Sequence, residues 1–222
     1  MSVLLLRLAG PMQSWGTQSR FTVRDTGREP SKSGVVGLLC AALGVPREDD
    51  GTLANLAALL MGVRVDRAGR IDCDYHTAGG GKINGRDYGV IKASGAKGDC
   101  LPSTRYFLAD ADFLVGLEGE ADLLRSLHKA LGAPRWPIFL GRKSFVPGRP
   151  VRIPDGLVEA TLEDALRGHL PLPRENYWLV LESSDTGDEV RMDQPLSFRL
   201  DARRFGLRHV TTKQIASGEE VP

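Results

Sequence analysis

The first two thirds of the chain alternate between short apolar runs and helical periodicities. Residues 3–8 are almost continuously apolar, which predicts a buried strand. The apolar stretch over 33–43 has the length of a helix, with Ser31 or Ser33 placed to cap its start and Gly44 placed to end it. The same patterns predict helices over 52–61 and 120–131 and strands over 63–65, 71–76, 106–108 and 113–117.

The resulting order is strand, helices, strand, strand with an inserted arm, strand, helix. It approximates the split β-α-β arrangement of ferredoxin-like domains, a frame that RNA-recognition folds share. We therefore predict an α+β protein with a ferredoxin-like (RNA-recognition-type) core over residues 1–150.

Patterns after residue 150 are weaker and predict a small C-terminal β-rich extension over 151–222. Thr161 and Asp164 form a capping box for a short helix that ends at Arg167. Strands are expected over 176–182 and 196–200.

The arm over residues 77–103 differs from the rest of the chain. Seven glycines lie between residues 78 and 98, and apolar side chains are too few there to form a core. The segment is therefore either a mobile loop or a long β-hairpin that projects from the body. A connection of this length inside a compact domain is usually functional or disordered.

Charge is segregated along the chain, although the formal net charge of the 222 residues is only +1. Basic residues gather over 17–47, 141–153 and 199–213, and acidic residues gather over 48–50, 110–122 and 182–193. This distribution fits one basic face that binds nucleic acid. Each cluster taken singly is also explained as solvated surface.

The cysteines and the hydropathy indicate the cellular compartment and argue against a metal site, a disulfide framework and a membrane span. Cys40, Cys73 and Cys100 lack the spacing of a zinc site or a disulfide framework, and Cys40 lies among core positions of a helix. No apolar run reaches the length of a signal peptide core or a membrane span. We expect a cytoplasmic protein without metal, cofactor or membrane contact.

The start of the chain combines features of an anion site. The strand over 3–8 leads into a glycine-bounded turn, 10–16, and a basic helix start follows at 31–34. Backbone N–H groups at a helix start attract phosphate, and the indole of Trp15 is suited to stack on a base or to cover the edge of the core. The segment 27–33 lacks the spacing of a P-loop, which argues against an NTPase.

Two further clusters carry candidate chemistry. The turn over 140–144 places Arg142 and Lys143 after a glycine, and these side chains are suited to bind phosphate. At the entry to the arm, Tyr75 and His76, with Lys92, could in principle cleave RNA. A structural or RNA-contacting role is the favoured interpretation, because no second histidine is near.

Four segments together resemble the CasD-type subunit of the type I-E CRISPR Cascade complex, a family of the repeat-associated RNA-binding superfamily. They are Leu-Leu-Leu-Arg-Leu-Ala-Gly-Pro-Met-Gln-Ser-Trp-Gly (4–16), Pro-Ser-Lys-Ser-Gly-Val-Val-Gly-Leu-Leu (30–39), Asp-Tyr-His-Thr (74–77) and Leu-Gly-Arg-Lys-Ser (140–144). The segments keep the family's order and spacing. The resemblance covers residues 3–150 well and the tail loosely.

The resemblance implies a non-enzymatic Cascade subunit that holds the 5′ handle of the CRISPR RNA beside the large subunit and the backbone subunits. Target DNA would be met only indirectly, through the complex. Residues 77–105 would form the family's thumb, lying across the guide RNA. Relatives from type I-C systems cleave precursor RNA, and the alternative is therefore a metal-independent endoribonuclease that processes precursor CRISPR RNA.

The predicted RNA-contacting set combines the turns, the helix start and the arm. Its members are Gln13, Ser14, Trp15, Arg28, Ser31, Lys32, Ser33, Gly34, Tyr75, His76, Lys82, Arg86, Lys92, Arg105, Arg142 and Lys143. Lys32, Arg142 and Lys143 are expected to neutralise phosphates, and Trp15 and Tyr75 are the stacking candidates.

Overall fold

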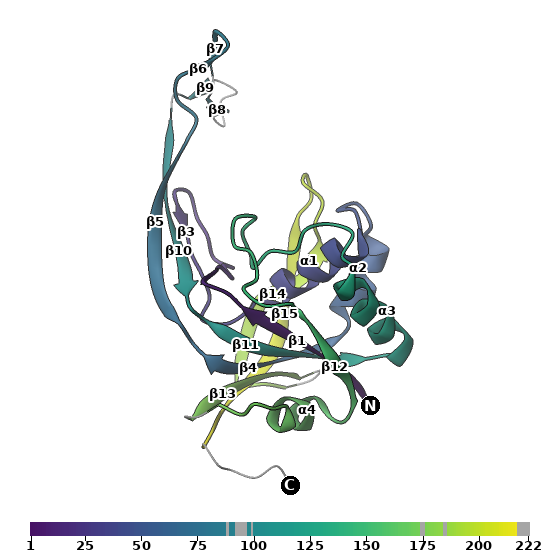
Figure 1. Cartoon of the computed structure of the whole chain (residues 1–222). Helices are drawn as coiled ribbons and strands as arrows, with labels where there is room; N and C mark the ends of the chain where they lie inside the picture. Colours follow the sequence, from purple (N-terminus) through teal and green to yellow (C-terminus); the bar gives the residue numbers. More distant parts are fainter. Residues whose placement is uncertain (88, 92–96, 99, 174–175, 184–185, 217–222) are drawn as a thin grey trace.

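The structure, a computed structural model, is built on a seven-stranded antiparallel sheet (Figure 1). It describes residues 1–87, 89–91, 97–98, 100–173, 176–183 and 186–216. In spatial order the strands are β12 (Arg152–Glu159), β1 (Ser2–Ala9), β11 (Asp112–Gly119), β4 (Leu60–Arg67), β13 (Tyr177–Ser183), β15 (Arg204–Ile215) and β14 (Glu189–Ser197). The α+β class predicted from the sequence is confirmed.

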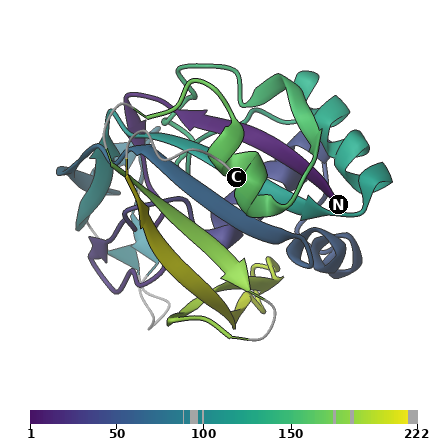
Figure 2. The ribbon, with the colours of Figure 1, turned by 90° about the horizontal axis from the view of Figure 1, so that it is seen from below.

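Helices cover both faces of this sheet (Figures 1 and 2). They are α1 (Lys32–Leu43), α2 (Asp50–Ala57) and α3 (Ala121–Gly132) on one face and α4 (Leu162–Gly168) on the other. Along β1, Leu4, Leu6 and Leu8 belong to the core under α1–α3, whereas Val3 and Leu5 belong to the core under α4. Because side chains alternate between the faces of a strand, burial on both faces explains the nearly continuous apolar run of β1.

The helix ends follow local sequence signals. Ser31 caps α1 by accepting a hydrogen bond from the backbone N of Gly34, and Gly44 ends the helix in the left-handed conformation, with φ of 74°. Thr161 caps α4 through the backbone N of Asp164, as expected. The helix predicted over 52–61 lies closer to the N-terminus in the structure, where it is capped by Asp49 and ends at Ala57.

The C-terminal part was the least well predicted. The strand expected over 196–200 is wrong, because β14 ends at Ser197 and the next strand, β15, begins at Arg204. The pattern also missed β12, which pairs with β1 at the edge of the sheet. Strands from both sides of residue 150 thus share one sheet, and the division into a domain and an extension stays a prediction.

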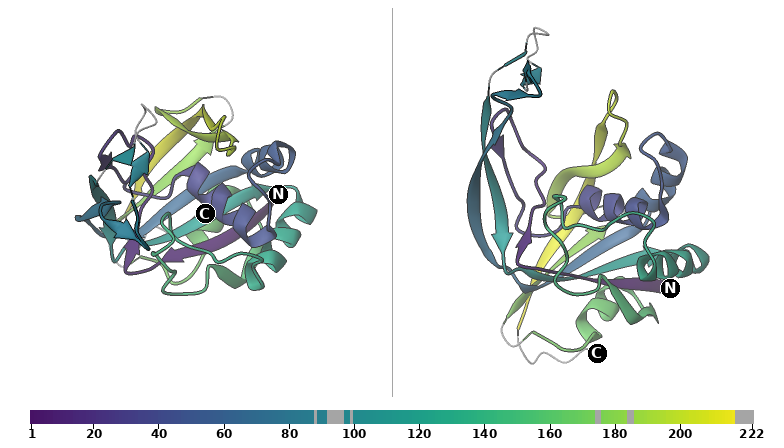
Figure 3. Two further views of the ribbon diagram at one scale, coloured as in Figure 1. Left: turned by 90° about the horizontal axis from the view of Figure 1, so that it is seen from above. Right: turned by 45° about the horizontal axis from the view of Figure 1, so that its top comes forward.

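A long β-hairpin projects from the body (Figures 1 and 3). Its strands, β5 (Arg70–Ala78) and β10 (Leu101–Ala109), pair antiparallel from Arg70↔Ala109 to Ala78↔Leu101 without a break. At its base, β10 also pairs with the short strands β2 (Met12–Gln13) and β3 (Val23–Arg24). The paired part begins at residue 70, before the start of the predicted arm at residue 77.

Short strand pairs continue the hairpin toward its tip. They are β6 (Lys82–Ile83) with β7 (Arg86–Asp87) and β8 (Val90–Ile91) with β9 (Lys97–Gly98). Gly81 and Gly85 have φ of 91° and 75°, a region that side chains rarely adopt, which explains part of the glycine content of this segment.

Candidate nucleic-acid interface

Gln13 and Trp15, two members of the predicted RNA-contacting set, lie in the core. Trp15 is 2% exposed, and its Nε1 donates to Oε1 of Gln13 at 3.1 Å. Nε2 of Gln13 donates to the backbone oxygens of Leu8 and Ala111, at 3.0 and 2.8 Å. The structure contradicts a base-stacking role for Trp15, because the ring is enclosed by protein and its polar atom is already paired.

The start of α1 packs directly on this indole. A Cβ on Gly34 would lie 2.8 Å from Cε3 of Trp15, which explains a glycine inside a helix. The backbone N of Gly34 donates to Oγ of Ser31 at 3.3 Å. Ser31 is buried, whereas Ser33 is half-buried and keeps access to solvent. Only part of the predicted helix-start site is therefore open to a ligand.

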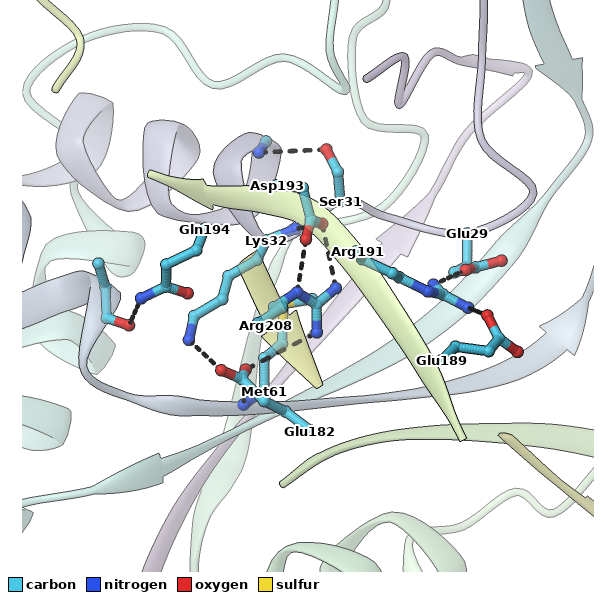
Figure 4. A network of polar contacts seen from close by, with 12 residues as sticks. Glu29, Ser31, Lys32, Met61, Glu182, Glu189, Arg191, Asp193, Gln194 and Arg208 are labelled. Carbon is cyan, nitrogen blue, oxygen red and sulfur yellow. Dashed lines mark hydrogen bonds and ion pairs between the residues drawn. The ribbon is translucent and has the colours of Figure 1, made fainter. Parts of the chain in front are cut away.

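Lys32 does not reach solvent but enters a buried ionic network (Figure 4). Its Nζ lies 2.6 Å from Oε1 of Glu182 on β13. Arg208 on β15 binds Asp193 on β14, with Nε to Oδ1 at 2.6 Å and Nη2 to Oδ2 at 3.0 Å. Glu182 also accepts from the backbone N of Met61 at 3.0 Å. The network ties α1 to the C-terminal strands.

An internal carboxylate already occupies the positive end of α1. Oδ2 of Asp193 accepts a hydrogen bond from the backbone N of Lys32 at 2.7 Å. Burial lowers the pKa of the Lys32 ammonium, and the charge of Glu182 offsets part of that effect. The prediction that Lys32 binds RNA phosphate is wrong, because the protein itself pairs both its ammonium and its backbone N–H.

The second predicted turn, 140–144, holds the base of the hairpin. Gly141 has φ of 90°, and a Cβ there would lie 1.8 Å from the backbone oxygen of Ser14. Arg142 Nη1 lies 3.2 Å from Oδ1 of Asp74 on β5, and its Nη2 donates to the backbone oxygen of Tyr106 on β10 at 2.7 Å. The guanidinium also lies over the ring of Phe145. Arg142 is thus committed to contacts within the protein.

We expect Arg142→Ala to loosen the hairpin base. The substitution leaves Asp74 without its arginine partner and removes one hydrogen bond to each hairpin strand. A hydrogen bond to a charged group contributes about 1.5–3 kcal/mol to stability. Hydrogen exchange of the amides of β5 and β10 should accelerate. Arg149→Ala is the control, because Arg149 is exposed. Equal exchange rates in both variants would show that Arg142 does not anchor the hairpin.

Tyr75 and His76 point to opposite faces of the hairpin, because successive residues of a strand alternate. Tyr75 is 70% exposed and stays available for stacking. Nε2 of His76 lies 2.8 Å from Oδ2 of Asp74. Burial alone would raise the pKa of Asp74, but His76 and Arg142 together hold it below its usual value.

The remaining members of the predicted set are spread over the surface and the hairpin. Arg28, Lys82 and Lys143 are exposed, Ser14 and Arg105 are half-buried, and Nε of Arg105 donates to Oγ of Ser103. Oγ of Ser14 lies 3.2 Å from the backbone oxygen of Tyr106. Arg86 belongs to β7, and Lys92 lies outside the described residues.

A groove of about 770 Å³ runs along α1. It contains Ser33, Gly34 and Lys143 from the predicted set. It also contains Arg47, Trp136 and Arg203, which the prediction left out. Arg47 and Arg203 belong to the basic clusters of the sequence, but nothing in the sequence indicates that they meet.

The described residues contain no group of three His, Cys, Asp or Glu side chains placed to hold a metal ion. Within the same residues, no helix is long and apolar enough to cross a membrane. Cys40 is buried, which raises the pKa of its thiol to about 11 and agrees with the predicted core position.

Comparisons with known proteins agree with one another. Residues 3–211 match the family model described as CRISPR-associated protein (Cas_Cas5). The chain is 33% identical over 211 residues to CRISPR system Cascade subunit CasD of Escherichia coli (strain K12), covering 88% of this chain and 89% of the relative.

Two solved structures are also similar. One is described as a crystal structure of Cas protein, with a TM-score of 0.74, 44% identity and coverage of 96% of this chain and 95% of that one. The other is a chain of a CRISPR RNA-guided surveillance complex, with a TM-score of 0.78, 36% identity and coverage of 96% and 90%. The chain therefore belongs to this family of CRISPR-associated proteins and is a CasD-type Cascade subunit.

Proposed function

We propose that the chain is a non-catalytic RNA-binding subunit of an antiviral surveillance complex and that it holds the 5′ handle of the CRISPR RNA. The observation that carries the proposal is the set of exposed cations around the hairpin and the neighbouring turns. Its members are Arg20, Arg24, Arg28, Lys82, Lys143 and Arg149. The described residues offer these side chains no ion pair, and they therefore remain available to neutralise phosphates.

The proposal includes a ferredoxin-like core and a thumb. The spatial order β12-β1-β11-β4, with helices between β1 and β4 and between β11 and β12, supports the core assignment. The projecting hairpin of β5 and β10 supports a thumb that lies across the guide RNA. In this proposal the whole thumb extends over 70–109, since pairing begins there.

Contacts with the large subunit and the backbone subunits form the second part of the proposal. Several apolar side chains on the hairpin and on the loop before β3 are exposed: Phe21 is 90% exposed, Tyr75 is 70% exposed and Ile71 is 44% exposed. Exposed apolar groups of this kind mark protein or nucleic-acid contacts. Target DNA would be met only through the assembled complex.

A salt titration tests handle binding. Lys143→Ala should reduce the slope of log affinity against log salt concentration by about 0.7, the value for one phosphate contact on single-stranded RNA. Lys213→Ala is the matched control, because Lys213 is paired with Glu163 on α4, on the opposite face of the sheet from α1. An unchanged slope for Lys143→Ala would remove this lysine from the interface, and no binding of handle RNA by the wild-type chain would refute the proposed function.

A cleavage assay tests the proposed lack of catalysis. The purified chain should give no site-specific product from precursor repeat RNA in the absence of metal. Tyr75 and His76 point to opposite faces of one strand, which does not suit joint action on one phosphate. A single product that disappears in His76→Ala would instead establish the endoribonuclease, because removing a general acid or base costs about 10²–10⁴-fold in rate.

A further inference from the structure

The groove along α1 has a floor of small residues and aromatic walls. Ser33, Gly37 and Ala41 follow one another at helical spacing and line the groove. The ring of Phe198 lies over Gly37, where a Cβ would be 3.9 Å away. Trp136 is held beside the far end of the helix, because its backbone N donates to the oxygen of Ala41 at 3.0 Å. The small residues leave room for a flat group between fixed walls.

The described residues that line the groove carry a net positive charge. Arg47, Lys143 and Arg203 line it, and none of the three has an ion-pair partner among the residues that the structure describes. Asp49, the acid among the described lining residues, is used to cap α2 through the backbone N and Oγ1 of Thr52. Burial, followed by the nearby charge of Arg47, lowers the pKa of Arg203. Arg47 and Arg203 thus line one groove without an ion pair among the described residues, although the guanidinium of Arg203 also lies over the ring of Phe205.

We propose that this groove binds one nucleotide of the CRISPR RNA that is splayed out of the strand, with its base against Trp136 and its phosphates on Arg47, Arg203 and Lys143. The inference rests on the proposed function and adds to it a site with its own residues. Single-stranded RNA is typically recognised through unstacked bases on aromatic side chains and arginine planes. A volume of about 770 Å³ lies within the range of small-ligand pockets, about 300–1,000 Å³.

The chemistry favours RNA over an acidic peptide. The groove combines aromatic rings with three cations, and a nucleotide presents a planar apolar face next to a permanent negative charge. An arginine pair is suited to phosphate, since each guanidinium offers a planar fork of donors. The alternative is that a partner protein occupies the groove, and the experiment distinguishes this case from RNA binding.

The experiment scans the handle RNA with single abasic substitutions and measures its affinity for the full chain. In the wild-type chain, one abasic position should cost about 10-fold in affinity, typical for one stacked base. Trp136→Ala should cost about the same, and the abasic position should cost little further in that variant, because both changes remove one contact. Trp178→Ala is the matched control, since Trp178 is similarly exposed but lies on β13.

A second measurement does not depend on a folded variant. Ultraviolet cross-linking of wild-type chain to handle RNA should attach a nucleotide to the segment around Trp136 or the segment around Phe198. The inference would be overturned if Trp136→Ala and the abasic position reduced RNA affinity additively. It would also be overturned if the cross-links were confined to other segments. Neither outcome would contradict handle binding itself. Loss of partner-subunit assembly in Trp136→Ala with unchanged RNA affinity would also overturn it and assign the groove to a protein. If the wild-type chain does not bind handle RNA, the proposed function itself fails.

Discussion

Replacing Trp15 by alanine should destabilise the fold by about 3–5 kcal/mol, the usual cost of truncating a large core side chain. The indole is 2% exposed, packs on Gly34 of α1 and binds Gln13. Truncation would leave a cavity at the junction of β2 and α1, together with an amide oxygen that has lost its donor. Chemical denaturation followed by far-UV circular dichroism measures the change in the free energy of unfolding.

Trp178→Ala is the control for that measurement. Trp178 lies on β13 and is 45% exposed, and its removal should change stability far less than that of Trp15. If Trp15→Ala keeps the wild-type stability and loses RNA affinity instead, the indole contacts RNA and its burial in this structure does not describe the bound protein.

Lys32→Met should destabilise the protein by about 3–5 kcal/mol, because it leaves the buried carboxylate of Glu182 with too little positive charge. The apolar stem of methionine fills most of the space of the lysine, and the loss therefore reports the missing charge. Equilibrium unfolding in urea gives the difference.

The chain contains a matched pair for comparison. Lys213 lies 2.7 Å from Glu163, almost the distance of 2.6 Å between Lys32 and Glu182, but its side chain is 44% exposed. Lys213→Met should cost no more than about 1 kcal/mol, because solvent screens an exposed ion pair. Equal losses for the two lysines would contradict the view that burial makes the Lys32 network structurally important.

Elements with strong local signals were predicted correctly. The apolar run of β1, a serine cap at the start of α1 and the end of α1 at Gly44 all depend on residues a few positions apart, although the sequence left the cap open between Ser31 and Ser33. Local patterns could not show that β14 ends at Ser197 or that β12 forms an edge strand. The partner of β12 is β1, which lies about 150 residues away in the sequence. β14 ends where its irregular pairing with the next strand, β15, ends, and a local pattern does not show this.

The candidate site was harder to predict than the fold. Polar neighbours made Trp15 look exposed, but alternation along the strand and turn places Gln13 and Trp15 on one buried side and leaves Ser14 half-buried. Lys32 looked like a phosphate ligand because its partners Glu182 and Asp193 lie 150 and 161 residues away. Arg142 likewise meets Asp74 across 68 residues. From the sequence alone, a charged residue whose partner lies many residues away cannot be distinguished from an unpaired one.

The sequence by itself determined the order and approximate positions of the main strands and helices before residue 150, that the chain has a long glycine-rich arm, and that its charges are segregated. These properties depend on backbone preferences and on side-chain periodicity within a few turns. The tertiary structure alone decided which cations are available to a ligand. It buried Lys32 against Glu182, tied Arg142 to the hairpin, and brought Arg47 and Arg203 together beside Trp136. The reason is physical: a charged side chain is available to an external ligand only when it is accessible and not already paired within the protein, and both conditions depend on contacts between distant segments.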